Sequence, residues 1–513
     1  MSPGLHAILS KVAAVCCSIM LVTTLSVIAV QRAEHRPEQT VAAKGTGGTG
    51  GTSTNGATAG APGAGDGTTP GAANGAGGPA AAGGPAGSAT APGGGAAQAA
   101  PGQATNPGAP GAANAPAPVA STGCKDANPD QGVFCDHITV GGTTVLSGPL
   151  AVYGEGGLKG GQAWISYYNK VIAPAEHLRP IKLVYYDDSD DPNKCLQFTQ
   201  RMVEVDHVLM LTGVTSPGAI KQYLEAKGVP LIGDIGLSPL SYQSPMIFPT
   251  AIAQVNTFPL RLKFAEEDYH VKTFAVIQDV LPGVDDSPFK AAWNKAAGDF
   301  NVKLVDYERI DSAGNSCDQQ FLTVLNKKPD YIFMPTASTS FLACIRSMRS
   351  QQVKPGANSP VAPNLKGIAG GSNLQIEVDQ CGDLCAGQYS AGSPFADPKV
   401  IGTAPAKQYL VNMQQYASGV EVSQFIALNY YHAGWVIYNL FKTAKITDNI
   451  SRQTVIAAAN HFGPFDTGFG NSITWTDKLP RIPSLCMYRV KDDGHHWVFD
   501  NKQECLDPSQ ATT

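Results

Sequence analysis

The sequence carries little charge and has no strongly basic stretch. Its 513 residues include 36 lysines and arginines against 41 aspartates and glutamates, which gives a formal net charge of −5 at pH 7. Proteins that bind nucleic acids neutralise phosphates with clustered cationic side chains, and the chain has no such cluster. We therefore expect no nucleic-acid partner.

Sequence motifs of several enzyme classes are missing as well. The chain has no Gly-x-Ser-x-Gly nucleophile elbow, no Walker A phosphate loop, no His-Glu-x-x-His zinc motif and no dinucleotide-binding fingerprint between a strand and a helix. No other constellation points to a catalytic centre. We therefore expect a protein that is not an enzyme and that uses no cofactor.

Metal-binding spacings are also absent. The chain has no Cys-x-x-Cys pair, and the acidic cluster Asp187, Asp188, Asp190 and Asp191 lacks the glycine and distal glutamate of an EF-hand loop. A Ca²⁺ site is one interpretation of this cluster. The favoured one is a solvated turn in which Asp191 or Asn193 caps the next helix.

Two segments of unusual composition precede the part that can fold. Residues 1–42 form a signal or anchor segment, because residues 12–30 are apolar, uncharged and just long enough to span a bilayer. Cleavage as a signal peptide and retention as a membrane anchor both stay open. Residues 43–121 are almost wholly Gly, Ala, Pro, Thr, Ser and Asn, which predicts a disordered linker. The remaining body, residues 122–513, is large enough for two lobes.

The cysteines indicate an exported protein. Of 11 cysteines, Cys16 and Cys17 lie in the apolar run, which leaves nine in a body of low charge. Disulfides are favoured over a metal site, which predicts an oxidising, extracytoplasmic compartment. Connectivity does not follow from sequence, but short spacings suggest four pairs with Cys195 left over. The candidate pairs are Cys124–Cys135, Cys317–Cys344, Cys381–Cys385 and Cys486–Cys505.

The body shows two runs of strands that alternate with helices. This order is typical of βαβ units and parallel sheets, so we predict an α/β fold with two doubly wound lobes. Ligands of such sheets bind beyond the carboxyl ends of the strands. The predicted strands are 138–146, 181–186, 208–211, 229–233, 274–277, 303–305, 331–334 and 367–369.

The stretch 138–169 begins the first lobe. We predict a strand, a break at Ser147-Gly148-Pro149, a bare glycine-rich loop over residues 154–161 and a helix over residues 162–169. A helix that starts near Gly160 presents unpaired N–H groups, which can hold a carboxylate or carbonyl oxygen. A plain βα turn without a ligand is the alternative.

The order of several short motifs resembles the type I periplasmic binding proteins, above all the branched-chain amino acid receptor group of ABC transporters. The motifs are SGPLAVYG at 147–154, YDDSDDP at 186–192, GVTSP at 213–217 and GVPLIG at 228–233. The resemblance covers residues 136–500. It implies two α/β lobes joined by a three-crossing hinge. Lobe I would hold about 136–255 and 391–465, and lobe II about 256–390 with the C-terminal part.

The resemblance also implies a ligand site between the lobes. In the family, small-residue and Ser/Thr loops after the first, third and fourth strands hold the ligand's carboxylate. Tyr153 is expected over the ligand or packed beneath the loop. An acid that meets the ligand's ammonium is missing at its usual place near residues 369–373, and Asp234 or Asp279 is the expected substitute. The residues that match the family's loops are Ser147, Gly148, Pro149, Leu150, Thr215, Ser216, Gly236 and Ser238.

The expected function is an extracytoplasmic, cell-envelope solute-binding protein. It would capture an amino acid, amide or carboxylate in an interlobe cleft and pass it to ABC permease subunits, with the N-terminal segment on or released from the membrane. The alternative is a membrane-tethered sensor receptor without a role in transport. A linker of about eighty residues has a reach of roughly 50 Å and transmits no force, which favours capture over sensing.

Overall fold

The computed structural model describes residues 124–512, except 125, 235, 237, 281–284, 313, 315, 335–336 and 357–358. The predicted signal or anchor segment, 1–42, and the predicted linker, 43–121, lie outside the described residues. Within the described part, no helix combines the length and the apolar character that crossing a membrane requires.

Lobe I is built on a parallel five-stranded sheet with the strand order β2-β1-β3-β4-β5. Its strands are largely buried because helices cover both faces, except for the edge strand 181–187, which is only half-buried. The strands are β1 (Ile138–Thr144), β2 (Ile181–Asp187), β3 (Met210–Val214), β4 (Leu231–Asp234) and β5 (Ile247–Pro249). The helices between them are α2 (Ala151–Tyr167), the π-helical turn η2 (Tyr168–Ile172), α3 (Ala173–Glu176), α4 (Pro192–Glu204) and α5 (Pro217–Lys227), with short 3₁₀ turns at η1 (Pro129–Gln131) and η3 (Pro239–Gln243).

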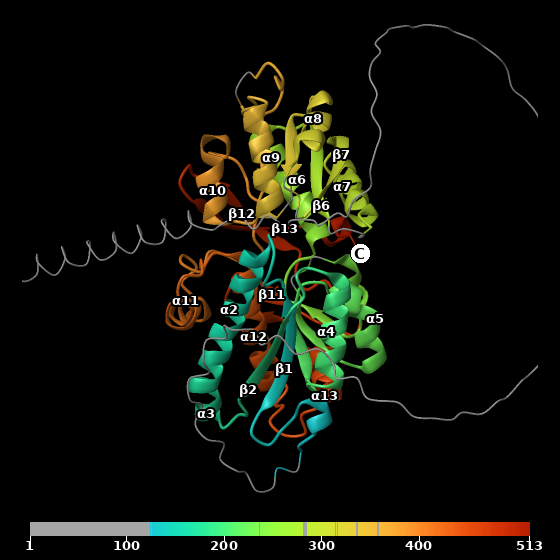
Figure 1. Cartoon of the computed structure of the whole chain (residues 1–513), viewed down its shortest axis with the longest axis vertical. Helices are drawn as coiled ribbons and strands as arrows, with labels where there is room; N and C mark the ends of the chain where they lie inside the picture. Colours follow the sequence, from blue (N-terminus) through green and yellow to red (C-terminus); the bar gives the residue numbers. More distant parts are fainter. Residues whose placement is uncertain are drawn as a thin grey trace, which may run out of the picture. The chain divides into compact units, whose positions relative to one another are not determined.

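Late elements of the chain complete this lobe. Helix α12 (Phe425–Thr443) packs along α2, and Figure 1 shows the two helices side by side. Trp475 is buried in the same core as Val140 of β1 and Val436 of α12. The other late elements are α11 (Ala404–Tyr416), α13 (Arg452–Ala459) and the two-residue strands β10 (Phe465–Asp466) and β11 (Ser472–Ile473).

Lobe II is built on a parallel sheet with the order β7-β6-β8-β9. A C-terminal hairpin extends it, because Tyr389 bridges β9 on one side and Lys491 of the hairpin on the other. The strands are β6 (Thr273–Val280), β7 (Lys303–Asp311), β8 (Tyr331–Met334), β9 (Gly367–Gly370), β12 (Cys486–Asp492) and β13 (Trp497–Cys505). The helices are α6 (Gln254–Tyr269), α7 (Ser287–Asp299), α8 (Asp318–Asn326), α9 (Ser338–Ser350) and α10 (Gln375–Cys381), with 3₁₀ turns at η4 (Gly382–Leu384) and η5 (Pro508–Gln510).

The chain crosses between the lobes three times. It leaves lobe I after β5 to enter α6, returns before Phe395, which packs with lobe I residues, and crosses again between Trp475 and β12. The α/β fold with two parallel-sheet lobes and a three-crossing hinge is therefore confirmed.

The predicted glycine-rich loop is wrong. Helix α2 begins at Ala151, so the glycines at 154–161 are helical. Gly154, Gly156, Gly157 and Gly160 provide close packing, whereas a Cβ atom added at Gly161 would have only one neighbour, at 3.8 Å. A Cβ atom added at Gly160 would lie 2.1 Å from the carbonyl oxygen of Ala427 in α12. Reciprocally, one added at Gly434 would lie 1.9 Å from the ring of Trp164. Helical glycine costs roughly 1 kcal/mol relative to alanine, and the close approach of α2 and α12 offsets that cost.

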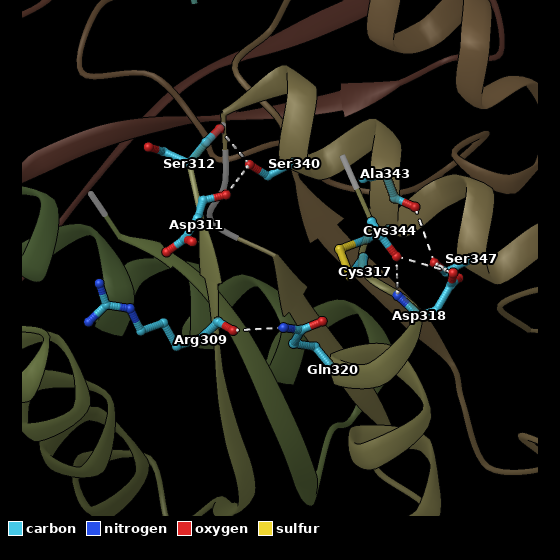
Figure 2. The surroundings of a disulfide bond; sticks show 11 residues. Arg309, Asp311, Ser312, Cys317, Asp318, Gln320, Ser340, Ala343, Cys344 and Ser347 are labelled. Carbon is cyan, nitrogen blue, oxygen red and sulfur yellow. Dashed lines mark hydrogen bonds between the residues drawn. A yellow bond between two sulfur atoms is a disulfide. The ribbon is translucent and has the colours of Figure 1, made fainter. Parts of the chain in front are cut away.

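Four disulfides link the candidate cysteine pairs, and Cys195 is free and buried. Figure 2 shows that Cys317, just before α8, is joined to Cys344 in α9. The hydroxyl of Ser340 donates to the carbonyl oxygen of Ser312, 2.8 Å away, just after β7. The disulfide thus ties α9 to the start of α8, and the hydrogen bond ties it to the segment after β7.

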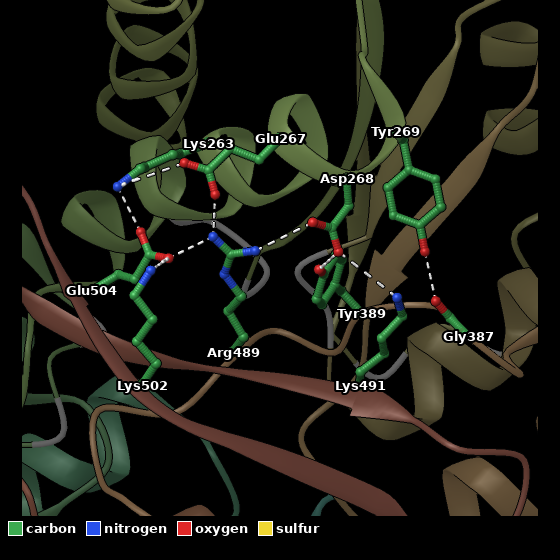
Figure 3. Close-up of polar contacts among 10 residues, drawn as sticks. All are labelled: Lys263, Glu267, Asp268, Tyr269, Gly387, Tyr389, Arg489, Lys491, Lys502 and Glu504. Atoms are coloured by element: carbon green, nitrogen blue, oxygen red, sulfur yellow. Dashed lines mark hydrogen bonds and ion pairs between the residues drawn. The ribbon is translucent and has the colours of Figure 1, made fainter.

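An ion-pair network holds the C-terminal hairpin on α6 (Figure 3). Lys263 of α6 donates to Glu504 of β13 at 2.5 Å, while Arg489 of β12 lies between Glu504 and the two acids Glu267 and Asp268. Arg489 and Glu504 are mostly buried, so solvent screens this network less than an exposed pair. The network fixes α6 relative to the extended sheet.

The α2–α12 packing predicts opposite effects for two adjacent substitutions. Gly160→Ala is expected to lower the free energy of unfolding by about 1–3 kcal/mol, because its Cβ overlaps the backbone of α12. Gly161→Ala is the matched control: its Cβ has only one neighbour, at 3.8 Å, so better helix propensity should raise stability by about 0.5–1 kcal/mol. Urea unfolding of the full chain measures both. Equal effects of the two variants would contradict this packing.

Candidate functional site

The carboxyl ends of β1 and β2 form one wall of the region between the lobes. Ser147, Gly148 and Pro149 are exposed there, while Leu150 is buried. Hydrogen bonds tie this loop to the end of β2: the N–H of Leu146 donates to Asp187 at 2.8 Å, and the hydroxyls of Ser147 and Ser189 lie 2.9 Å apart. The loop is therefore held in place by its neighbour strand.

Tyr153 joins the two lobes. Its ring lies in a small apolar cluster with Val145 and Leu150 of lobe I and Leu374 of lobe II. Its hydroxyl donates to Ser372 at 3.3 Å and accepts the backbone N–H of Ser338 at the start of α9. Burial raises the pKa of this phenol, so it stays neutral at physiological pH. Of the two interpretations of Tyr153, packing describes the geometry in this structure.

Glu377 is a buried acid of lobe II that the sequence interpretation missed. Its carboxylate accepts the N–H of Ser372 at 2.8 and 2.9 Å, the N–H of Leu374 at 3.1 Å and the hydroxyl of Ser338. The carboxylate of Glu377, from the first turn of α10, therefore lies beside the 369–373 loop, where the sequence itself has no acid. Burial raises the pKa of Glu377 to about 7. The only sequence signal is a glutamate three residues after a helix start.

The third-strand loop brings Thr215 and Ser216 beside the acidic turn. The Thr215 hydroxyl donates to Asp188, whose side chain is fully buried. Ser216 is 8% exposed, and its hydroxyl oxygen has no hydrogen-bond partner among the described residues. A buried hydroxyl without a partner can receive a hydrogen bond from a ligand.

The fourth-strand loop turns toward the hinge. Gly236 has a φ of 80°, and a Cβ there would lie 2.4 Å from the carbonyl oxygen of Ile252, so only glycine fits. Asp234 accepts the N–H of Gly236 at 3.1 Å and the hydroxyl of Ser241 at 2.5 Å. Ser238 lies over Gly218, at the start of α5. Asp234 therefore stabilises its own turn, which makes Asp279 the better candidate for an acid that meets a ligand.

Asp279 and Arg261 bring opposite charges to the lobe II side. Asp279 lies near the carboxyl end of β6 and accepts the N–H of Ala337 at 2.7 Å. Burial raises its pKa to about 6, against the lowering effects of the Ala337 N–H and of Arg261. Arg261 is 8% exposed, and its Nε has no acceptor among the described residues. Burial lowers the pKa of this guanidinium to about 9, although the charge of Asp279 opposes the shift.

The acidic turn after β2 faces Asp279 across the lobes. The prediction that Asp191 caps the next helix is confirmed, because its carboxylate accepts the N–H groups of Asn193 and Lys194. The prediction of a solvated turn is wrong for Asp188, which is buried. Burial, then the charges of Asp188 and Asp279, raise the pKa of Asp190 to about 7. No group of acids, histidines and cysteines that could hold a metal occurs among the described residues.

Together these groups form a candidate site on the facing strand ends. The structure places Ser147–Leu150, Tyr153, Thr215 and Ser216 on lobe I and Asp279 on lobe II, while Gly236 lies against the hinge. The apolar contact through Tyr153 and the charge interaction of Asp190 with Asp279 both cross between the lobes. Two parallel sheets, three crossings and polar strand ends that face one another define the type I periplasmic binding protein fold.

A family model described as a periplasmic binding protein matches residues 137–495, and the chain belongs to that family. The leucine-binding protein of Thermotoga maritima aligns with a TM-score of 0.60 at 14% identity, over 73% of this chain and 99% of that chain. A search of curated proteins finds no match.

Other solved structures with the same fold are solute-binding proteins with different ligands. One is a protein of R. palustris in complex with 4-hydroxybenzoate, with a TM-score of 0.58 and 18% identity over 72% of this chain and 96% of that chain. Another is a fatty acid ABC transporter protein of Thermomonospora curvata, with a TM-score of 0.61 and 17% identity over 75% and 96%. The fold therefore occurs with amino acid, aromatic acid and fatty acid binders, and it does not name a ligand.

The raised pKa of Asp190 predicts a pH-dependent stability. A carboxyl whose pKa is higher in the folded protein contributes stability below its unfolded pKa of about 4, and this contribution is lost as the pH rises through about 7. Asp190→Asn should therefore raise the free energy of unfolding by about 1–2 kcal/mol at pH 8, after allowance for partial exposure, and by little at pH 4. Urea unfolding at both values measures this difference.

Asp191→Asn provides the control for this experiment. Asparagine caps helices about as well as aspartate, so stability should change little at either pH. Asparagine also suits position 190, which has a φ of 62°. An Asp190→Asn variant that is no more stable than the parent at pH 8 would contradict the raised pKa of Asp190, whose causes are burial first and then the charges of Asp188 and Asp279.

Proposed function

We propose that this protein is an extracytoplasmic solute-binding protein that captures a small polar ligand between its two lobes for an ABC importer. Membership of the periplasmic binding protein family supports a position outside the cytoplasm, and the four disulfides agree with an oxidising compartment. ABC permease subunits are the proposed partners. The N-terminal segment is proposed to hold the protein at the membrane or to direct its secretion.

The observation that carries the proposal is the set of polar side chains at the facing strand ends of the two lobes. Lobe I offers the exposed Ser147 loop and the hydroxyls of Thr215 and Ser216. Lobe II offers Asp279, which accepts a hydrogen bond just before α9, and the guanidinium of Arg261, whose charge interacts with Asp279. A ligand that bridges these groups would gain charge-assisted hydrogen bonds on both lobes and so stabilise their closed arrangement.

The charges favour a ligand that donates hydrogen bonds. Asp190 and Asp279 repel one another across the lobes when both are ionised. An ammonium or amide N–H between them removes this repulsion, whereas a ligand with only a carboxylate does not. Arg261 is the candidate partner for a carboxylate or carbonyl at the other end of the ligand. Amino acids and amides are therefore favoured over simple acids within the proposed class.

Three compounds with one carbon skeleton test this proposal. Leucine carries an ammonium and a carboxylate, leucinamide lacks the carboxylate, and 4-methylpentanoate lacks the ammonium. In a thermal-shift assay at pH 7.5, we compare for each compound the part of the stabilisation that Asp279→Asn removes. We expect this part to follow the order of donor content, with 4-methylpentanoate weakest. The same comparison with phenylalanine, phenylalaninamide and 3-phenylpropanoate extends the test to aromatic ligands. A ligand at one hundred times its Kd stabilises by roughly 2.7 kcal/mol, which the assay resolves.

Two variants locate the effect. Asp279→Asn should reduce the thermal shift of the best ligand to near zero, while Asp448→Asn, an exposed acid of lobe I, should leave it unchanged. If amino acids, amides and carboxylates all fail to shift the unfolding temperature of the unmodified chain, the receptor function is wrong. If simple carboxylates stabilise best and Asp279→Asn strengthens them, the receptor function stands and the preference for donor ligands is wrong.

A further inference from the structure

Lobe I contains a cavity at the amino-terminal ends of its strands, opposite to the carboxyl ends that face lobe II. It lies among the first residues of β1 and β2, the turn η2 that follows α2, and the last turns of α12, and its volume is about 210 Å³. Aliphatic side chains form much of its wall, namely those of Ile138, Val140, Ile181, Ile437, Ile446 and Ile450. None of the residues used in the proposed function lines it.

One polar group at this cavity lacks an acceptor. Arg179 pairs with Asp126 through Nη2, at 2.5 Å from Oδ1. The Nη1 atom of the same guanidinium is buried and meets no hydrogen-bond acceptor among the described residues. A buried cationic N–H that finds no acceptor carries its full cost of desolvation, and Arg179 is one of the residues that line the cavity, so an anionic oxygen beside its guanidinium would be favoured.

The remaining polar groups leave an excess of positive charge. Glu176 accepts hydrogen bonds from Tyr438 at 2.7 Å and from Lys442 at 2.9 Å. The hydrogen bond from Lys442 lowers the pKa of Glu176, and that from Arg179 lowers the pKa of Asp126, so both acids are ionised at neutral pH. Lys445, which is exposed, also lines the cavity. Three cations thus face two carboxylates.

The wall of the cavity is held by specific contacts. Tyr168, in the π-helical turn η2, donates to the carbonyl oxygen of Arg179 at 3.1 Å. Asn169 of the same turn donates to the carbonyl oxygen of Ile181 and accepts its N–H, both at 2.8 Å. Single π-helical turns often occur at functional sites. Here the turn fixes the start of β2 and the backbone of Arg179, so the cavity is formed before any ligand enters.

We propose that this cavity binds a medium-chain aliphatic monocarboxylate, with its tail among the isoleucines and its carboxylate beside the guanidinium of Arg179. The volume equals about seven waters at ~30 Å³ each, which suits a tail of roughly six to eight carbons and is too small for the acyl chains of a membrane lipid. An apolar cavity of about 150 Å³ already suffices for benzene in another protein. This site does not depend on the function proposed for the interlobe region.

A chain-length series on the full chain tests the proposal. By isothermal titration with butanoate, hexanoate, octanoate, decanoate and tetradecanoate, affinity should rise about three- to fourfold per methylene until the cavity is filled near octanoate, and then level off. With ¹³C-labelled isoleucine methyl groups, octanoate should shift the signals of Ile437 and Ile446 but not that of Ile426, which packs beside Tyr153. A shift confined to Ile426, an affinity that rises through tetradecanoate, or no binding would overturn the proposal.

Arg179→Lys tests recognition of the carboxylate. Lysine keeps a cation for Asp126 but lacks the second N–H group of the guanidinium, so octanoate should bind at least tenfold more weakly. Octanol should bind the variant and the parent equally, which separates loss of the anion contact from damage to the cavity wall. Lys445→Gln should weaken octanoate two- to threefold, and Lys407→Gln, an exposed lysine on α11, should have no effect. Equal losses for octanoate and octanol in Arg179→Lys would refute the assigned carboxylate contact.

Discussion

The close contact of α2 with α12 is the constraint on which both candidate sites depend. Glycines on each helix let the backbones approach, and Trp164 fills the space over Gly434. The helices run in the same direction, since Gln424 before α12 bonds to Val152 near the start of α2, and Tyr438 near its end packs on Tyr168. The N-terminal ends of the two helices therefore lie toward lobe II, where Tyr153 of α2 contacts it. Their C-terminal ends lie at the apolar cavity, where the last turns of α12 form part of the wall.

Electrostatics between the lobes oppose their contact, while an apolar cluster favours it. Asp188 and Asp190 on one side and Asp279 on the other place carboxyls near one another, and burial raises the pKa of two of them toward neutrality. Tyr153, Leu150 and Leu374 supply the apolar contact. In the proposed function, a ligand with complementary charge that bridges the two lobes would remove this opposition and favour the arrangement to which it binds.

Several features of the site followed from the sequence. Strands that alternate with helices predicted parallel sheets, while the resemblance to the family's loops supplied Ser147 and Thr215 as candidate residues, which lie after β1 and β3. Arg261 and Glu377 were missed, because each sits in a helix whose pattern indicates only packing or capping. Their importance comes from partners far along the chain: Asp279 for Arg261, and Ser338 and Ser372 for Glu377. A pattern within a short window contains no information about such partners.

The glycines at 154–161 show most clearly what the sequence determined and what only the tertiary structure decided. The sequence by itself determined the fold class, the order of strands and helices, the family and the positions of the cysteines, because periodicity and short motifs are local properties. Only the tertiary structure decided that these glycines lie inside α2. Glycine permits both a bare turn and a tightly packed helix. At Gly157 and Gly160 the packing is set by α12, which begins more than 250 residues later and leaves no room for a side chain.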